Sequence, residues 1–154
     1  MSDKEKKRNR YARITKQLAD LLKRTDNRLA RMASISAVLH HKMDGFFWTG
    51  FYFLQGNRLV AGPYQGPVAC QELEYGKGVC WAAVLQKKTV VVEDIDKFPG
   101  HIACDARSKS EIVVPVRDPA GEIIAVLDID SKGLANFDDT DAAELEKIVE
   151  LINM

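Results

Sequence analysis

The chain has 154 residues, 46% of them hydrophobic and 29% charged, and its 22 Lys and Arg balance its 22 Asp and Glu. This is the composition of an ordinary soluble protein with one domain and a core of its own. No apolar run approaches the roughly 20 residues of a membrane span, and the N-terminal MSDKEKKRNR lacks the apolar region of a secretory signal, so we expect a cytoplasmic protein.

The basic charge is concentrated at the N-terminal end. Residues 1–42 hold 12 of the 22 Lys and Arg but only four acids. A solvated helix face, or a partner for an acidic surface elsewhere in a dimer, explains this better than nucleic-acid binding. The basic run has no interleaved aromatic residues and no groove-reading motif.

The N-terminal third shows the apolar spacing of α-helices. Residues 10–42 are predicted to form one interrupted helix or two consecutive helices, with Asp26 as a plausible N-cap for the second. Residues 1–25 are interpreted as a basic extension or helix that precedes a domain of residues 26–154. The apolar positions are Ile14, Leu18, Leu21, Leu22, Leu29, Met32, Ile35, Val38 and Leu39.

Strand patterns begin after residue 45. FFWTGFYFL (46–54) alternates, with Trp48, Gly50 and Tyr52 on one face, and QGN at 55–57 is a turn. The later predicted elements are strands at 58–62 and 68–73, a glycine-rich loop and short helix at 75–88, a strand at 89–94, a loop at 94–110, strands at 111–117 and 122–130 joined by a DPAG turn, and an amphipathic helix at 137–152.

This order predicts an α+β fold with a mainly antiparallel sheet. The N- and C-terminal helices are expected on one face, with loops and the short helix on the other. The loop over residues 94–110 is long enough to suggest a lid or a binding loop, and it contains Cys104.

Three acids could meet at one end of this sheet. Asp128 and Asp130 share a face of the last strand, and Glu111 opens the neighbouring strand. Three acids in one pocket would suit an ammonium group, and crowding would raise a pKa enough for one of them to donate a proton. The ordinary alternative is a strand end that emerges into solvent.

Trp48 and Tyr52 share a face of the first strand, for which core packing is the ordinary explanation. If that face also bears Asp128, Trp48 would line a pocket suited to an apolar or S-methyl group.

The three cysteines argue against a permanent disulfide framework, and their spacing matches no zinc motif, so we expect no metal site. Cys80 is either a thiol whose pKa a helix N-terminus lowers or a small buried residue, and Cys70 is either a core residue or a partner thiol. Cys104 has the best case for reactivity because it lies in a polar loop near His101 and Asp105.

Four motifs together resemble one known family. FFWTGFYF, GPVACQELEYGKGVCW, FPGHIACDARSKSEIVVPV and AVLDIDS occur in the order of the free methionine-(R)-sulfoxide reductases, enzymes built on a single GAF domain. The resemblance runs from roughly Leu39 to Leu151 and includes all three cysteine positions. It implies that Cys104 is the catalytic nucleophile, Cys70 the main resolving cysteine and Cys80 an auxiliary thiol.

The resemblance also assigns the remaining site residues. Glu111, Asp128 and Asp130 would hold the substrate and activate its sulfoxide, with Glu111 or Asp130 donating the proton, and Trp48 would pack on the methyl end. The implied enzyme reduces free methionine-(R)-sulfoxide through a cysteine sulfenic acid and an intramolecular disulfide. A thioredoxin-like dithiol then recycles it without a cofactor.

Two further expectations remain open. The alternative function is a non-enzymatic GAF module that binds a small ligand, which leaves the three cysteines without a task. We also expect a homodimer through the terminal helices, because amphipathic flanking helices need a second apolar surface.

Overall fold

The computed structural model describes residues 1–101 and 104–154, and in these residues a six-stranded antiparallel sheet has the order β3-β2-β1-β6-β5-β4. The strands are β1 (Trp48–Gln55), β2 (Arg58–Gln65), β3 (Glu72–Leu73), β4 (Val90–Val92), β5 (Ser110–Arg117) and β6 (Ile123–Ser131). The helices are α1 (Asp3–Leu22), α2 (Arg28–Lys42), α3 (Gly78–Gln86) and α4 (Asp139–Glu150), with short 3-10 turns η1 (Ile95–Lys97) and η2 (Leu151–Asn153).

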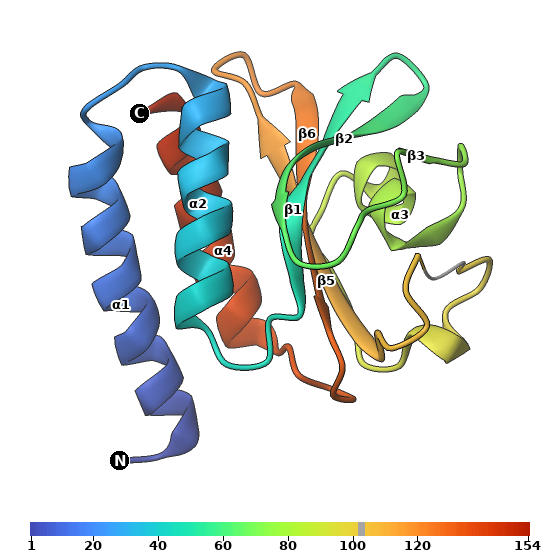
Figure 1. The fold of residues 1–154 in the computed structure, drawn as a ribbon, viewed down its shortest axis with the longest axis horizontal. Helices are drawn as coiled ribbons and strands as arrows, with labels where there is room; N and C mark the ends of the chain where they lie inside the picture. Colours follow the sequence, from blue (N-terminus) through green and yellow to red (C-terminus); the bar gives the residue numbers. More distant parts are fainter. Residues whose placement is uncertain (102–103) are drawn as a thin grey trace.

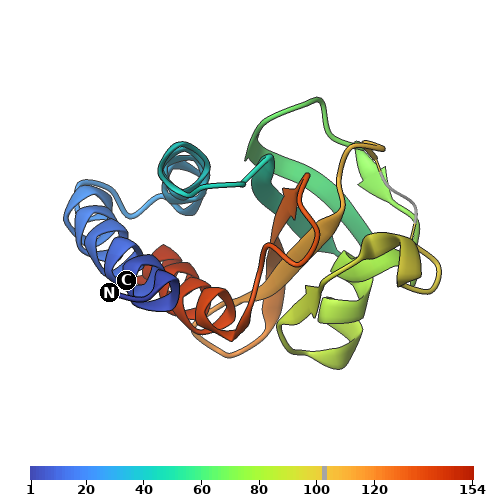
Figure 2. The same cartoon turned by 90° about the horizontal axis from the view of Figure 1, so that it is seen from below.

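The two faces of the sheet are covered by different layers. Helices α2 and α4 lie on one face with α1 packed outside them, and α3 lies on the other face (Figures 1 and 2). Phe51 and Leu127 point into the core beneath the three helices, whereas Tyr52 and Val126 point into the core beneath α3. This alternation confirms the predicted period of two in β1 and β6, and the α+β fold class is confirmed with it.

Helix α1 begins earlier than residue 10, where apolar spacing alone placed it. Ser2 caps it by accepting a hydrogen bond from the amide of Glu5. The N-cap of α2 is Asn27 and not Asp26, because the Asn27 side chain accepts from the amide of Ala30. Both helix starts depend on polar capping contacts, which the spacing of apolar residues does not reveal.

The strand predicted at 68–73 is shorter, and the one predicted at 58–62 is longer. Only Glu72–Leu73 forms β3, while β2 continues to Gln65, which pairs with Thr49 of β1. Upstream of β3, the carbonyls of residues 67 and 70 bind side chains of β1 and not a neighbouring strand. The predicted loop at 94–110 contains η1, and its residues 102 and 103 lie outside the described residues.

The basic N-terminal segment is helical and packs on the rest of the chain. Buried Tyr11, Ile14 and Leu18 of α1 join the core formed with α2, α4 and the sheet. Three of its basic residues pair with acids outside the segment, namely Lys4 with Asp139 (3.0 Å), Lys7 with Asp141 (2.8 Å) and Arg10 with Asp44 (2.7 Å).

Most apolar side chains of the terminal helices are therefore buried within one chain, and Leu21 and Leu29 are the exposed exceptions among the predicted apolar positions. The homodimer was predicted because the apolar faces of these helices needed a second surface, and that reason no longer holds, so the homodimer stays an untested prediction. Among the described residues, we find no helix with the length and apolar character needed to cross a membrane.

Candidate functional site

A cavity of about 240 Å³ opens on the α3 side of the sheet. Strands β1, β5 and β6 form its floor, and α3, the segment before β3 and the loop before β5 form its walls. All seven residues predicted for the site line it, namely Trp48, Cys70, Cys80, Cys104, Glu111, Asp128 and Asp130. The fold thus brings together side chains from six segments.

Strand register places the three acids side by side. Glu111 of β5 lies directly opposite Asp130 of β6, and Asp130 also faces Trp48 of β1. Asp128, two residues before Asp130, points to the same face of the sheet. The predicted meeting of these acids at one end of the sheet is confirmed, because only 4% of Glu111 and 6% of Asp128 is exposed and neither emerges into solvent.

Burial and crowding decide how the acids share protons. Burial raises the pKa of Glu111 well above its ordinary value, and the nearby charge of Asp128 raises it further. The same two causes raise the pKa of Asp130. Burial also raises the pKa of Asp128, but contacts with the Glu111 carboxyl and the Cys80 thiol oppose that rise. The arrangement therefore favours the protonated form more strongly at Glu111 and Asp130 than at Asp128.

Two carboxylate oxygens in the cavity are left for a ligand. Within the described residues, Glu111 Oε1 and Asp128 Oδ1 are buried and have no hydrogen-bond partner. Buried polar atoms are nearly always paired, so these two mark a position where a donor such as an ammonium group would bind.

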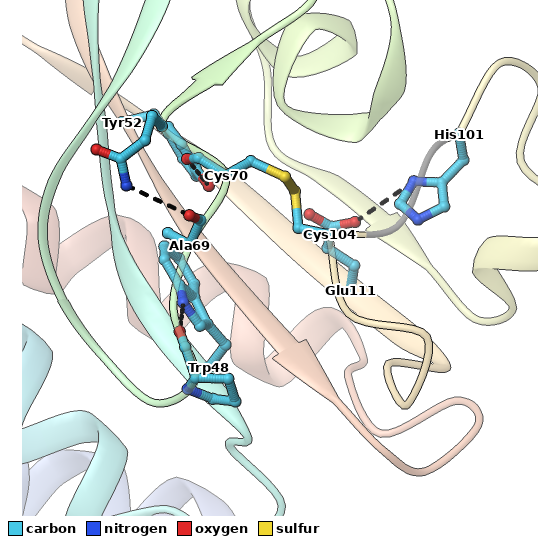
Figure 3. Close-up of a disulfide and its surroundings, with 9 residues drawn as sticks. Trp48, Tyr52, Ala69, Cys70, His101, Cys104 and Glu111 are labelled. Atoms are coloured by element: carbon cyan, nitrogen blue, oxygen red, sulfur yellow. Dashed lines mark hydrogen bonds and ion pairs between the residues drawn. A yellow bond between two sulfur atoms is a disulfide. The ribbon is translucent and has the colours of Figure 1, made fainter.

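Cys70 and Cys104 form a disulfide at the edge of the cavity, with their Cα atoms 5.7 Å apart (Figure 3). Cys104 is exposed and Cys70 is partly exposed, so a thiol from outside could reach the bond. The two residues are 34 positions apart in the sequence, and the fold alone brings them together.

Cys80 is a free, buried thiol in the first turn of α3. Burial raises its pKa well above the ordinary value, and the charge of Asp128 raises it further. The alternative in which the helix N-terminus lowers this pKa is therefore wrong, and the alternative of a small buried residue is confirmed.

Cys80, Glu111 and Asp128 also place three potential metal ligands within 4.8 Å of one another. Because burial raises the pKa of both Cys80 and Glu111, each would have to lose a proton before it could bind a cation. These residues belong to α3, β5 and β6, so the cysteine spacing could not reveal the group. The expectation of no metal site stays a prediction.

Aromatic side chains of β1 hold the segment that carries Cys70. Trp48 Nε1 donates to the carbonyl of Pro67 (3.0 Å), and the Tyr52 hydroxyl donates to the carbonyl of Cys70 (3.2 Å) (Figure 3). Trp48 stacks between Tyr52 and Tyr64, with ring centroids 5.7 and 5.2 Å away. Trp48 thus belongs to the core and lines the cavity as well. Sequence reasoning missed the contact of Tyr52 with Cys70, because periodicity shows the face of a side chain but not its partner.

The two polar neighbours of Cys104 in the sequence have different surroundings. Asp105 binds Arg107 (2.7 Å), which lowers the pKa of the carboxyl to about 2. His101 lines the cavity with its Nδ1 4.0 Å from Glu111 Oε1, and burial lowers its pKa. Both residues line the cavity, but Asp105 is paired with Arg107, whereas His101 faces Glu111.

Comparisons with known proteins agree with this geometry. The family model described as GAF domain matches residues 29–154. GAF domain-containing protein A of Dictyostelium discoideum is 44% identical over 97% of this chain and 94% of its own length. The free methionine-R-sulfoxide reductase of Escherichia coli is 41% identical over 90% of this chain and 84% of its own length. The X-ray structure of the free methionine-R-sulfoxide reductase of Neisseria meningitidis in complex with its substrate has a TM-score of 0.91 and 40% identity, covering 99% of this chain and 90% of that one.

Proposed function

This chain belongs to the GAF-domain family of free methionine-R-sulfoxide reductases, and from that membership we propose that it reduces free L-methionine-(R)-sulfoxide to methionine. One observation carries the proposal: a disulfide between Cys70 and Cys104 borders the same cavity as three acids, two of which, Glu111 and Asp128, are buried with an unpartnered oxygen. A module that only binds a ligand would have no use for this combination.

The cavity suits a free amino acid. The substrate ammonium binds the unpartnered Oδ1 of Asp128, because negative charge is better stabilised on this acid than on its neighbours, and Glu111 is left for the sulfoxide. Asp130 borders the same position, and the apolar S-methyl end packs on Trp48. A methionine sulfoxide inside a peptide has no free ammonium, so it would leave the buried carboxylate of Asp128 unpaired, which is costly. This cost provides selectivity for the free amino acid.

Chemistry begins with the disulfide reduced. The thiolate of Cys104 attacks the sulfoxide sulfur while a carboxylic acid protonates the sulfoxide oxygen. We assign this proton to Glu111, because it is the more deeply buried of the two acids whose pKa burial raises well above the ordinary value. The oxygen passes to Cys104 as a sulfenic acid, and methionine leaves with its sulfur reduced to a thioether.

The second half of the cycle restores the thiols. Cys70 attacks the sulfenic sulfur of Cys104, which forms the disulfide and releases the oxygen as water. A thioredoxin-like dithiol then reduces the disulfide by exchange, and no bound cofactor takes part. Cys80 acts as an auxiliary thiol that donates a hydrogen bond to Asp128, since its raised pKa makes it a poor nucleophile at rest.

Recycling of a disulfide by a cellular dithiol requires a reducing compartment, so we propose the cytoplasm as the location of this protein. For a second copy of the chain, Leu21 (39% exposed) and Leu29 (55% exposed) offer apolar surface where α1 leads into α2. Sedimentation velocity at micromolar concentration tests this dimer, and a monomer would contradict it.

The deciding experiment is a turnover assay with both sulfoxide epimers and a small dithiol. The wild type should form methionine from the R epimer, and no methionine at all would overturn the proposal in favour of a ligand-binding module. Cys104→Ser should abolish even the first turnover. Cys70→Ser should release one methionine per protein and then fail to recycle with thioredoxin, so repeated turnover by this variant would contradict the role of Cys70.

A further inference from the structure

His101 lines the cavity, yet the proposed reaction gives it no task. Its side chain is only 12% exposed, and within residues 1–101 and 104–154 neither Nδ1 nor Nε2 has a hydrogen-bond partner. A buried polar group without a partner is costly and uncommon in a native protein. We therefore expect a hydrogen-bond partner that His101 contacts at another stage of the catalytic cycle.

The nearest candidate for that partner is Glu111. His101 Nδ1 lies 4.0 Å from Glu111 Oε1, and Figure 3 shows the imidazole facing this carboxyl. Because Oε1 is also unpartnered, one contact would satisfy both buried groups. The separation exceeds a normal N–H···O hydrogen bond by about 1 Å, which a small movement of the loop would close.

The disulfide gives a reason for the gap. Cys104 follows His101 by three residues and is tied to Cys70 in this structure. In the dithiol state that tie is absent, and the proposed reaction starts from the dithiol state. Reduction of the disulfide therefore removes one constraint on the position of His101 at the stage when Glu111 must deliver its proton.

The charged groups around His101 come from three elements and its own loop. Asp96 of η1 tends to raise the pKa of the imidazole, but burial has the larger effect and lowers it. Glu111 faces the ring from β5, with Asp128 and Asp130 of β6 behind it, while Asp105 is paired with Arg107. The ring is thus neutral at neutral pH and carries one N–H, which it can donate to Glu111.

On the basis of the proposed reductase function, we infer that His101 is the positioning residue for Glu111. In the dithiol state its Nδ1–H donates a hydrogen bond to Glu111 Oε1. This bond orients the carboxyl toward the sulfoxide and stabilises the carboxylate that remains after proton transfer.

A matched pair of variants tests the donor. His101→Phe keeps the ring shape and removes the N–H, whereas His101→Asn places an amide N–H near the position of Nδ1. His101→Phe should lower kcat by about tenfold to hundredfold, since hydrogen bonds to charged groups contribute on that scale, with little change in KM. His101→Asn should stay within about threefold of the wild type, and His41→Phe, at an exposed position of α2, should have no effect.

The pH profile separates this role from a structural one. A hydrogen bond from His101 favours the carboxylate form of Glu111, so its loss in His101→Phe should move the alkaline limb of kcat to higher pH. His101→Asn should keep the limb of the wild type. Wild-type kcat and pH profile in His101→Phe, or equal losses in both variants, would overturn the inference.

A second measurement does not depend on turnover. The chain has three histidines, and the ¹⁵N NMR signals that His101→Asn removes identify those of His101. In the dithiol state, the wild-type ring should be the neutral Nδ1–H tautomer, and the Nε2–H tautomer would overturn the inference. Absence of methionine formation by the wild type would instead refute the reductase function and leave this result standing.

Discussion

Replacing Glu111 with glutamine should make the protein more stable and less active. The substitution keeps the size of the side chain, and the amide can donate hydrogen bonds to Asp128 and Asp130, which lie beside it. It removes the carboxyl proton that we assign to the sulfoxide oxygen. Loss of a general acid lowers kcat by about 10²-fold to 10⁴-fold.

The gain in stability follows from proton linkage. Glu111 has its pKa raised in the folded state, so above the ordinary value of 4.5 the unfolded chain loses a proton that the folded chain keeps. Stability must then fall as pH rises, by about 1.4 kcal/mol per pH unit for each such proton, until the folded pKa is reached. Glutamine has no proton to lose, so the variant should gain on the wild type by up to about 1.4 kcal/mol per pH unit as the pH rises from 4.5 toward the folded pKa of Glu111.

Urea unfolding with the disulfide intact, at whole pH units from 5 to 8, measures this difference. The plot of unfolding free energy against pH should slope less steeply for Glu111→Gln than for the wild type. Glu122→Gln, at an exposed position just before β6, is the control and should keep the wild-type slope. Parallel slopes for Glu111→Gln and the wild type would show that Glu111 holds no proton at neutral pH, and the reasoning about the acids would fail.

Three smaller substitutions test how the site is held. Gly50→Ala would place a Cβ 2.2 Å from Cβ of Tyr64 on β2. We therefore expect the free energy of unfolding, measured by thermal unfolding, to fall by about 3 kcal/mol. A fall of less than about 1 kcal/mol would contradict the close approach of the two strands. Tyr52→Phe removes the hydrogen bond to the carbonyl of Cys70 and should lower the free energy of unfolding by about 1 kcal/mol. It should also slow disulfide formation after substrate reduction, which quenched-flow thiol trapping measures. An unchanged rate would argue against positioning by Tyr52. Tyr11→Phe removes the buried 2.5 Å hydrogen bond to Asp141 and should cost about 2 kcal/mol in urea unfolding, whereas wild-type stability would mean that α1 contributes little through this contact.

Local patterns in the sequence were enough to predict the layers of the fold. Alternation in 46–54 placed Phe51 and Tyr52 on opposite faces of one strand, and alternation in 122–130 did the same for Leu127 and Val126, as the structure confirms. The DPAG turn also follows from short-range chemistry, because Asp118 accepts hydrogen bonds from the amides of Ala120 and Glu122. Such features depend on neighbours only a few residues apart, so they can be read from the chain itself.

Element boundaries were less predictable where side chains bind the backbone. The strand expected at 68–73 shortens to Glu72–Leu73, and Asn27 replaces Asp26 as the N-cap of α2. In both places, a hydrogen bond between a side chain and a backbone group decides the local conformation, and apolar periodicity carries no information about such bonds.

The sequence by itself determined the fold class, the family resemblance and the list of candidate residues, because motifs and periods are local properties of the chain. Only the tertiary structure decided that Glu111 lies opposite Asp130, that Cys70 meets Cys104 across 34 positions, and that burial raises the pKa of Cys80 where a helix N-terminus would have lowered it. Strand register, disulfide partners and desolvation all depend on which distant segments come together. That choice is made by packing of the whole chain, and no short stretch of sequence contains it.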